Sequence, residues 1–190
     1  MNSAVPMKQN RAGWLIGFAV FFTVGLIVLL GLGLMRNGAA PLANGSAPAF
    51  EIKSFEGQTY RLADLRGRPV VINFWASWCK ECRDEAAFLE ATWKQYREQG
   101  LIVIGVDYVD TEPEAKAYLA QFGITYPNGA DLQTRISQAY HITGVPETYF
   151  ITRDGKLLEG LDSKGRAYGN WIGPIPEASL SERVLRLLQN

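Results

Sequence analysis

The two cysteines of this chain, Cys79 and Cys82, are separated by only two residues, and no other cysteine occurs among its 190 residues. They follow the apolar run 70–75, which is typical of a strand buried on both faces. They precede residues 83–99, where apolar side chains recur at helical spacing. A cysteine pair at a strand-to-helix junction can close and reopen a small disulfide, and its first sulfur lies at the positive end of the helix macrodipole, which stabilises a thiolate. The placement therefore favours thiol–disulfide exchange.

The two sulfurs should have different roles. At the start of a helix we expect Cys79 to be exposed at the tip and Cys82 to be turned inward. Only a thiolate attacks a disulfide, so Cys79 is the candidate nucleophile and Cys82 the candidate resolving cysteine. A static structural disulfide is the alternative, although a bridge across so short a loop removes little unfolded-state entropy. Haem attachment needs a histidine where the chain has Arg83, and structural zinc needs four ligands where it offers two cysteines and the single His141.

Residues 14–35 contain no charged side chain and are rich in Leu, Ile, Val, Phe and Gly. As a helix these residues would extend about 33 Å, enough to cross the hydrocarbon core of a bilayer. The apolar core of a signal peptide is normally shorter. Cleavage remains an alternative, because 38–49 contains Ala-x-Ala-like stretches. The preferred interpretation is a single uncleaved transmembrane anchor.

The charges that flank this segment predict its orientation. Lys8 and Arg11 precede it together with the amino terminus, and only Arg36 follows it before Glu51. Basic residues favour the cytoplasmic side, so residues 1–13 should be cytoplasmic and the rest of the chain extracytoplasmic. That compartment is oxidising, and the two cysteines would rest there as a disulfide unless something reduces them.

The remainder of the chain should form one domain. Residues 36–48 are the expected linker, since from position 37 onward they are small, uncharged and turn-prone. Residues 49–190 are numerous enough for one ordinary domain with its own core. The 19 acidic and 19 basic residues cancel, so nothing suggests nucleic acid as a partner.

Strands and helices alternate along this domain and end in a hairpin and a helix, which predicts an α/β fold with a mixed sheet and helices on both faces. The expected strands are 59–62, 70–75, 101–106, 147–151 and a return strand at 156–161 after a turn at 153–156. The expected helices are 83–99, 113–122, 132–140 and 179–188, the last with Ser179 as its N-cap.

Two segments carry a resemblance to a known family. They are Val-Ile-Asn-Phe-Trp-Ala-Ser-Trp-Cys-Lys-Glu-Cys-Arg-Asp-Glu at 71–85 and Gly-Val-Pro-Glu-Thr-Tyr at 144–149. The chain resembles thioredoxin-fold proteins over about 49–188. More narrowly, it resembles the membrane-tethered reductases of the TlpA, ResA and CcmG (DsbE) group, which keep apocytochrome c thiols reduced before haem attachment. The resemblance implies a thioredoxin fold with an N-terminal extension.

The resemblance also implies a substrate site. Pro146 matches the cis-proline that faces the active-site disulfide in this superfamily, and an ordinary trans turn is the alternative. A cis bond would bring the backbone of Val145 beside Cys79, where a substrate strand could pair with it. Trp78 would contact the substrate next to the disulfide. Glu147 flanks the proline loop and would make the groove acidic, unless it is an ordinary exposed residue at the start of a strand.

Glu85 is matched in the cytochrome-maturation branch, one helical turn after Cys82. A partly buried carboxylate there would have a raised pKa and could exchange protons with the dithiol, whereas the alternative is a solvated helix residue. Thioredoxin itself has a buried Asp where this chain has Asn73, which makes Glu85 the remaining candidate. A second departure is Glu81, where many relatives have an uncharged residue and where an acid disfavours the thiolate.

The resemblance implies a thiol–disulfide oxidoreductase that acts as a reductant outside the cytoplasm, with apocytochrome c cysteines as substrate, a membrane electron donor as partner and no cofactor or metal beyond its own disulfide. One alternative is an oxidant or a general reductase for other exported proteins. Another is a copper-delivery module, which usually has Cys-x-x-x-Cys and a distant histidine such as His141. A peroxidase would want a Thr or Pro pattern before its cysteine, which Ala76-Ser77-Trp78 does not supply.

Overall fold

The computed structural model describes residues 11–36 and 42–190, and the chain divides into two compact units, 1–40 and 41–190. In the first unit, helix α1 (Arg11–Arg36) contains the expected membrane span at 14–35. Its described apolar side chains, such as Trp14 and Phe21, are exposed. Among the described residues, no helix combines the length and the apolar character needed to cross a membrane. The anchor stays a prediction, and the parts of the expected cytoplasmic segment and linker at 1–10 and 37–41 lie outside the described residues.

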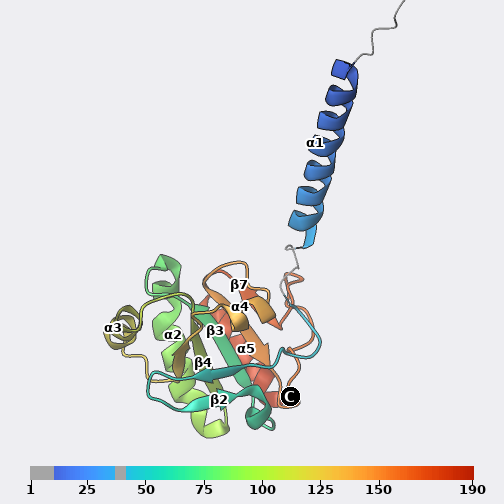
Figure 1. Ribbon diagram of the computed structural model, residues 1–190. Helices are drawn as coiled ribbons and strands as arrows, with labels where there is room; N and C mark the ends of the chain where they lie inside the picture. Colours follow the sequence, from blue (N-terminus) through green and yellow to red (C-terminus); the bar gives the residue numbers. More distant parts are fainter. Residues whose placement is uncertain (1–10, 37–41) are drawn as a thin grey trace, which may run out of the picture. The chain divides into compact units, whose positions relative to one another are not determined.

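The second unit is built on a five-stranded mixed sheet with the order β5-β4-β3-β6-β7 (Figure 1). The strands are β3 (Val70–Trp75), β4 (Ile102–Asp107), β5 (Asn128–Ala130), β6 (Glu147–Ile151) and β7 (Asn170–Ile172). Strand β3 is parallel to β4 and antiparallel to β6, while β7 is antiparallel to β6. Every residue of β3, β4 and β6 is buried, because layers of chain cover both faces of the sheet. The expected α/β architecture with a mixed sheet is confirmed.

Helices cover the sheet on both sides. One apolar cluster joins one face to α2 (Lys80–Tyr96) and α5 (Glu177–Gln189), through residues such as Leu89 and Leu187. The cluster on the other face includes Phe50 from the N-terminal segment and Ile136 from α4 (Arg135–Ala139). Helix α3 (Glu112–Phe122) begins with a capping box between Thr111 and Glu114 and packs near Trp75.

The N-terminal extension packs against the domain. Strands β1 (Glu51–Lys53) and β2 (Thr59–Arg61) form an antiparallel pair that leads into a 3₁₀ turn at Leu62–Leu65. The described part of the expected linker, 42–48, also contacts the domain. Leu42 packs on the core, and the Leu157 amide donates to the Gly45 carbonyl. Small residues allow this close approach of backbone to backbone.

The structure corrects the expected return strand at 156–161. On the side away from β3, β6 pairs with β7, which lies more than ten residues later in the chain. Near the turn only an isolated bridge joins Ile151 to Leu157, and the chain then leaves the sheet. A second isolated bridge, between Leu161 and Ala167, closes the loop that follows. The last helix also begins earlier than expected, at Glu177 after Pro176, so Ser179 is not its N-cap.

Candidate active site

Cys79 and Cys82 form a disulfide at the start of α2. Cys79 is the N-cap residue, and its sulfur accepts a hydrogen bond from the Cys82 amide at 3.0 Å. This bond takes up one of the free N–H groups at the beginning of the helix, where the macrodipole is positive. The same N–H could stabilise negative charge on Sγ of Cys79 once the disulfide is reduced.

The expectation that Cys79 is exposed is wrong for the disulfide form. The exposed fractions of Cys79 and Cys82 are 3% and 1%. Both belong to an apolar cluster with Trp75 and Ala86, and Val145 packs against this cluster. Trp78 is the exposed member of the segment, with 60% of its surface accessible.

The loop between β3 and the disulfide is held through Ser77. Its amide and hydroxyl both donate to the carboxylate of Asp110, at 2.5 and 2.9 Å. Its carbonyl accepts a hydrogen bond from Arg83 at 3.1 Å. From α3, the Tyr118 hydroxyl donates to the carbonyl of Cys82 at 2.9 Å. Neighbouring elements thus anchor the backbone on both sides of Cys79.

The peptide bond between Val145 and Pro146 is cis, as the resemblance implies. Pro146 is buried directly before β6, and its carbonyl accepts from the Gly173 amide at 2.9 Å. Val145 is half-buried against the cluster that contains the disulfide. Within the described ranges, the N–H and C=O of Val145 make no backbone hydrogen bond. They are available to pair with an extended segment of another protein.

Glu85 is buried one turn after Cys82, with an exposed fraction of 1%. Its two oxygens accept hydrogen bonds from the Asn73 amide group at 2.7 Å and from the Ile175 backbone N–H at 2.8 Å. Burial raises the pKa of Glu85 to about 7, although these two hydrogen bonds favour the carboxylate and act in the opposite direction. Glu85 is therefore a buried acid that titrates near neutral pH, and not a solvated helix residue.

Glu147 is buried at the start of β6, so the alternative of an ordinary exposed residue is wrong, and its contact with a substrate stays a prediction. Its exposed fraction is 0%. Its carboxylate accepts from the Tyr149 hydroxyl at 2.7 Å and from the Thr143 amide at 3.1 Å, so it joins the proline loop to β6. Burial raises the pKa of Glu147, while the hydrogen bonds lower it in part. This is the environment of a structural carboxyl group.

Two further acids near the disulfide loop were not anticipated. Asp107 ends β4 opposite Trp75, and Asp110 follows three residues later, with exposed fractions of 0% and 5%. Burial, together with the adjacent carboxyl of Asp110, raises the pKa of Asp107 to about 8. The sequence did carry a signal for Asp107. It is a charged residue at the end of the otherwise apolar strand β4, which lies next to β3, the strand before the cysteines.

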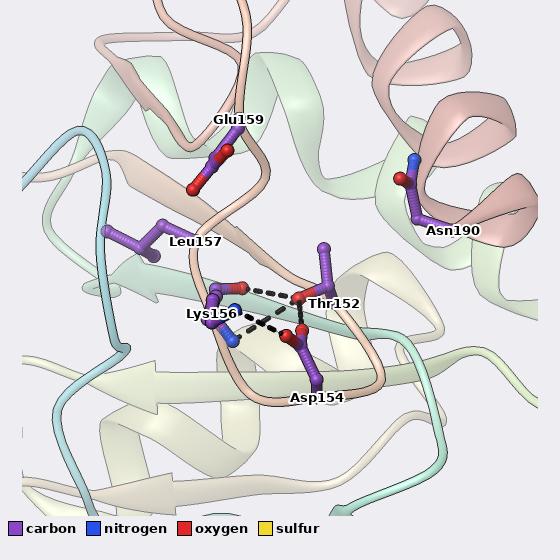
Figure 2. A pocket seen from close by; sticks show the side chains of 6 residues that line it. All are labelled: Thr152, Asp154, Lys156, Leu157, Glu159 and Asn190. Atoms are coloured by element: carbon purple, nitrogen blue, oxygen red, sulfur yellow. Dashed lines mark hydrogen bonds and ion pairs between the residues drawn. The ribbon is translucent and has the colours of Figure 1, made fainter.

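Among the described residues, no group of three His, Cys, Asp or Glu side chains is placed to hold a metal ion. A surface hollow of about 260 Å³ lies beside the turn that follows β6, at the end of the strand away from Pro146. Figure 2 shows side chains that line it. There Lys156 pairs with Asp154 at 3.0 Å, and none of the site residues Cys79, Cys82, Glu85 and Pro146 lines the hollow.

Comparisons with known proteins agree with this geometry. The model of the AhpC/TSA family matches residues 43–159. The chain is 34% identical over 160 residues to a "Thiol-disulfide oxidoreductase ResA" of Bacillus cereus, an alignment that covers 80% of this chain and 88% of the relative. The protein of the same name from Bacillus subtilis (strain 168) is 27% identical, with 80% and 86% covered.

Solved structures show the same architecture. A thiol:disulfide interchange protein of the thioredoxin family from Chlorobium tepidum TLS superposes with a TM-score of 0.64 at 26% identity, over 79% of this chain and 98% of that one. StoA from Bacillus subtilis superposes with a TM-score of 0.58 at 20% identity, over 73% and 97%. The expected thioredoxin-like α/β fold is confirmed.

Proposed function

This chain belongs to the AhpC/TSA family and to the ResA thiol-disulfide oxidoreductases, and from that premise we propose that it acts as a reductant of protein disulfides outside the cytoplasm. The observation that carries the proposal is the Cys79–Cys82 disulfide at the start of α2, with the buried carboxyl of Glu85 one turn later. This arrangement combines a sulfur that can ionise with a group that can exchange its proton.

In the proposed reaction the thiolate of Cys79 attacks one sulfur of a substrate disulfide. A mixed disulfide forms, and the second substrate sulfur leaves as a thiolate that takes up a proton. Cys82 then loses its proton, attacks Sγ of Cys79 and releases the first substrate sulfur. Two electrons pass to the substrate, and the Cys79–Cys82 disulfide is restored. A membrane electron donor must reduce it again, because an oxidising compartment does not.

The other site residues have proposed roles on either side of this disulfide. Glu85 accepts the proton that Cys82 loses, supported by its position on the same helix and its pKa of about 7. Trp78 contacts the substrate through its exposed ring. The backbone of Val145, held in place by Pro146, pairs with the segment of substrate that carries the cysteines.

The proposed substrate is the cysteine pair of an apocytochrome c, which the resemblance to the cytochrome-maturation group supports. The proposed location is the cytoplasmic membrane, with residues 14–35 as a single span, the amino terminus inside and the catalytic domain outside. The uncharged sequence of this segment and the basic residues before it support that location. Release of the full chain from membranes by alkaline carbonate would contradict the anchor.

Trapping in living cells tests the proposal. With Cys82→Ser the mixed disulfide cannot be resolved, so we expect covalent complexes with apocytochrome c that a reducing agent releases. The matched control, Cys79→Ser, should form none. Capture by Cys79→Ser and not by Cys82→Ser would reverse the two roles. Capture of many exported proteins without apocytochrome c would support a general reductase or oxidant instead. The resting state of the wild type separates those two, since a reductant is substantially reduced in cells and an oxidant is fully oxidised.

A further inference from the structure

Asp110 binds the loop ahead of Cys79 with both of its carboxylate oxygens. Oδ2 accepts from the Ser77 amide and Oδ1 from the Ser77 hydroxyl. Asp110 is 5% exposed, so little water competes for these bonds. It immediately precedes Thr111, the N-cap of α3, whose hydroxyl and amide engage Glu114. One end of this link is thus the disulfide loop, and the other is a well-formed helix start.

Asp107 lies three residues before Asp110, and its carboxylate accepts no hydrogen bond from the described residues. Both of its oxygens are buried without a hydrogen-bond partner among the described residues. Its neighbour Asp110 is also an acid, so the two carboxyls can bond to each other only when one of them carries a proton. Two ionised carboxylates at such a buried site would repel each other strongly.

The surroundings leave Asp107 few other sources of compensation. Its pKa is perturbed by burial and by Asp110 alone. The ionisable side chains of the neighbouring elements have hydrogen bonds or ion pairs elsewhere: Arg83 and Glu85 on α2, Glu112, Glu114, Lys116 and Tyr118 on α3, and Asp131 after β5. A proton is therefore the counter-charge that this pair can use.

We propose that Asp107 and Asp110 share one proton and act as positioning residues that fix the loop 76–78 ahead of the attacking sulfur of Cys79. Asp107 in its neutral form donates to Asp110, and Asp110 in its ionised form accepts from Ser77. The pair touches neither sulfur nor substrate, and it acts through the backbone. This inference rests on the proposed function only in taking Cys79 as the attacking sulfur.

The loop connects this pair to Cys79 in two short steps. Ser77 is two residues before Cys79, and the Cys79 amide donates to the Ala76 carbonyl at 3.2 Å. The Cys82 amide in turn reaches Sγ of Cys79 at 3.0 Å. If Ser77 is released, Cys79 can move away from the helix start that stabilises its thiolate. Loss of the shared proton leaves two buried carboxylates, whose repulsion moves Asp110 away from Ser77. Cys79 should then become less reactive than its thiolate fraction predicts.

The rate at which iodoacetamide alkylates Cys79 in the reduced full-length protein, followed by mass spectrometry from pH 5 to 10, tests this inference. Asp110→Ala is the decisive variant, because loss of the charge and loss of the positioning change the alkylation rate in opposite directions. Removal of a negative charge alone would favour the thiolate and speed alkylation at pH 7, whereas loss of positioning slows it, by about two- to fivefold if the helix-start interaction is lost. Asp110→Asn keeps an acceptor for the Ser77 amide and a donor for its hydroxyl, and it should restore at least the wild-type rate.

Asp107→Asn tests the proton itself, because an amide donates to Asp110 at every pH. The wild type should show a second inflection near pH 8, where Asp107 ionises, and Asp107→Asn should lack it while matching the wild type at pH 7. Alkylation of Asp110→Ala as fast as the wild type, or a second inflection that persists in Asp107→Asn, would overturn the inference. If Asp110→Ala does not fold, Asp107→Asn decides alone. The reaction needs no protein substrate, so failure to reduce apocytochrome c would count against the proposed function and leave this measurement unaffected.

Discussion

Replacing Glu85 by glutamine should change how the stability of the disulfide form depends on pH. Burial raises the pKa of Glu85 from its ordinary 4.5 to about 7 in the folded protein. An acid whose pKa is raised by folding binds its proton more tightly in the folded state. The stability that Glu85 contributes is therefore fully present below pH 4.5 and is lost as the pH rises through about 7. The pKa differs by about 2.5 units between the folded and unfolded states, and one unit corresponds to about 1.4 kcal/mol. The free energy of unfolding should therefore fall by about 3 kcal/mol across this window.

The structure indicates that glutamine can be accommodated. Glu85 accepts from the Asn73 amide group, which also donates to the Thr148 hydroxyl at 3.1 Å. If the Asn73 side chain flips, its oxygen can accept both from the introduced amide and from the Thr148 hydroxyl. The oxygen of the introduced glutamine still accepts from the Ile175 amide. The nitrogen and the oxygen of the introduced amide then each have a partner, so the fold should survive the substitution.

Urea unfolding of the oxidised protein between pH 4.5 and 8 measures the effect. The free energy of unfolding of Glu85→Gln should fall by about 3 kcal/mol less over this range than that of the wild type. Comparing the two proteins cancels the contributions of other acids, including Asp107. Glu81→Gln, on the exposed face of the same helix, is the matched control and should follow the wild type.

Glu85→Gln should also lower the rate of disulfide reduction and remove an inflection near pH 7. Parallel stability curves together with an unchanged pH–rate profile would refute the role given to Glu85.

Two further substitutions test how the scaffold holds the site. Gly105→Ala should destabilise the protein by about 2 kcal/mol, because a Cβ in β4 would overlap Oδ1 of Asn128, which accepts from the Trp75 indole at 2.9 Å. Its control is Gly144→Ala, where an added Cβ meets no atom within 4 Å, and equal unfolding midpoints for the two variants would contradict this account. Thr111→Ala should cost about 1 kcal/mol in the same assay, because it removes the capping box of α3, and an unchanged midpoint would show that the box contributes nothing.

Local patterns in the sequence were enough to predict much of this architecture. Continuous apolar character located β3, and the same signal located β4 to within one residue. A strand pattern before a turn located β6 at Glu147–Ile151. The pairing of β6 with β7 was not predictable in this way, since the chain leaves the sheet between Leu158 and Tyr168 and returns through only three residues. Strand β5 is equally short and contains a glycine, so it carries too little hydrophobic pattern to be recognised.

The side-chain environments of the site were harder to anticipate. Glu85 and Glu147 are both acids that burial raises in pKa, and nothing in their local sequence says that either is buried. Glu85 receives only two hydrogen bonds in a buried position, one from a segment 90 residues away. The burial of Cys79 likewise depends on how the loop at Val145 packs against it.

The sequence by itself determined that two cysteines stand where a strand meets a helix and that a proline loop follows much later, because residue type and spacing dictate both features. Only the tertiary structure decided which carboxyl groups lie in the interior and which of them must share a proton. Burial and hydrogen bonding arise from segments far apart in the chain, and they set the pKa of Glu85 and bring Asp110 to Ser77. Asp107 and Asp110 are close in sequence, but only the packing around them excludes water from both.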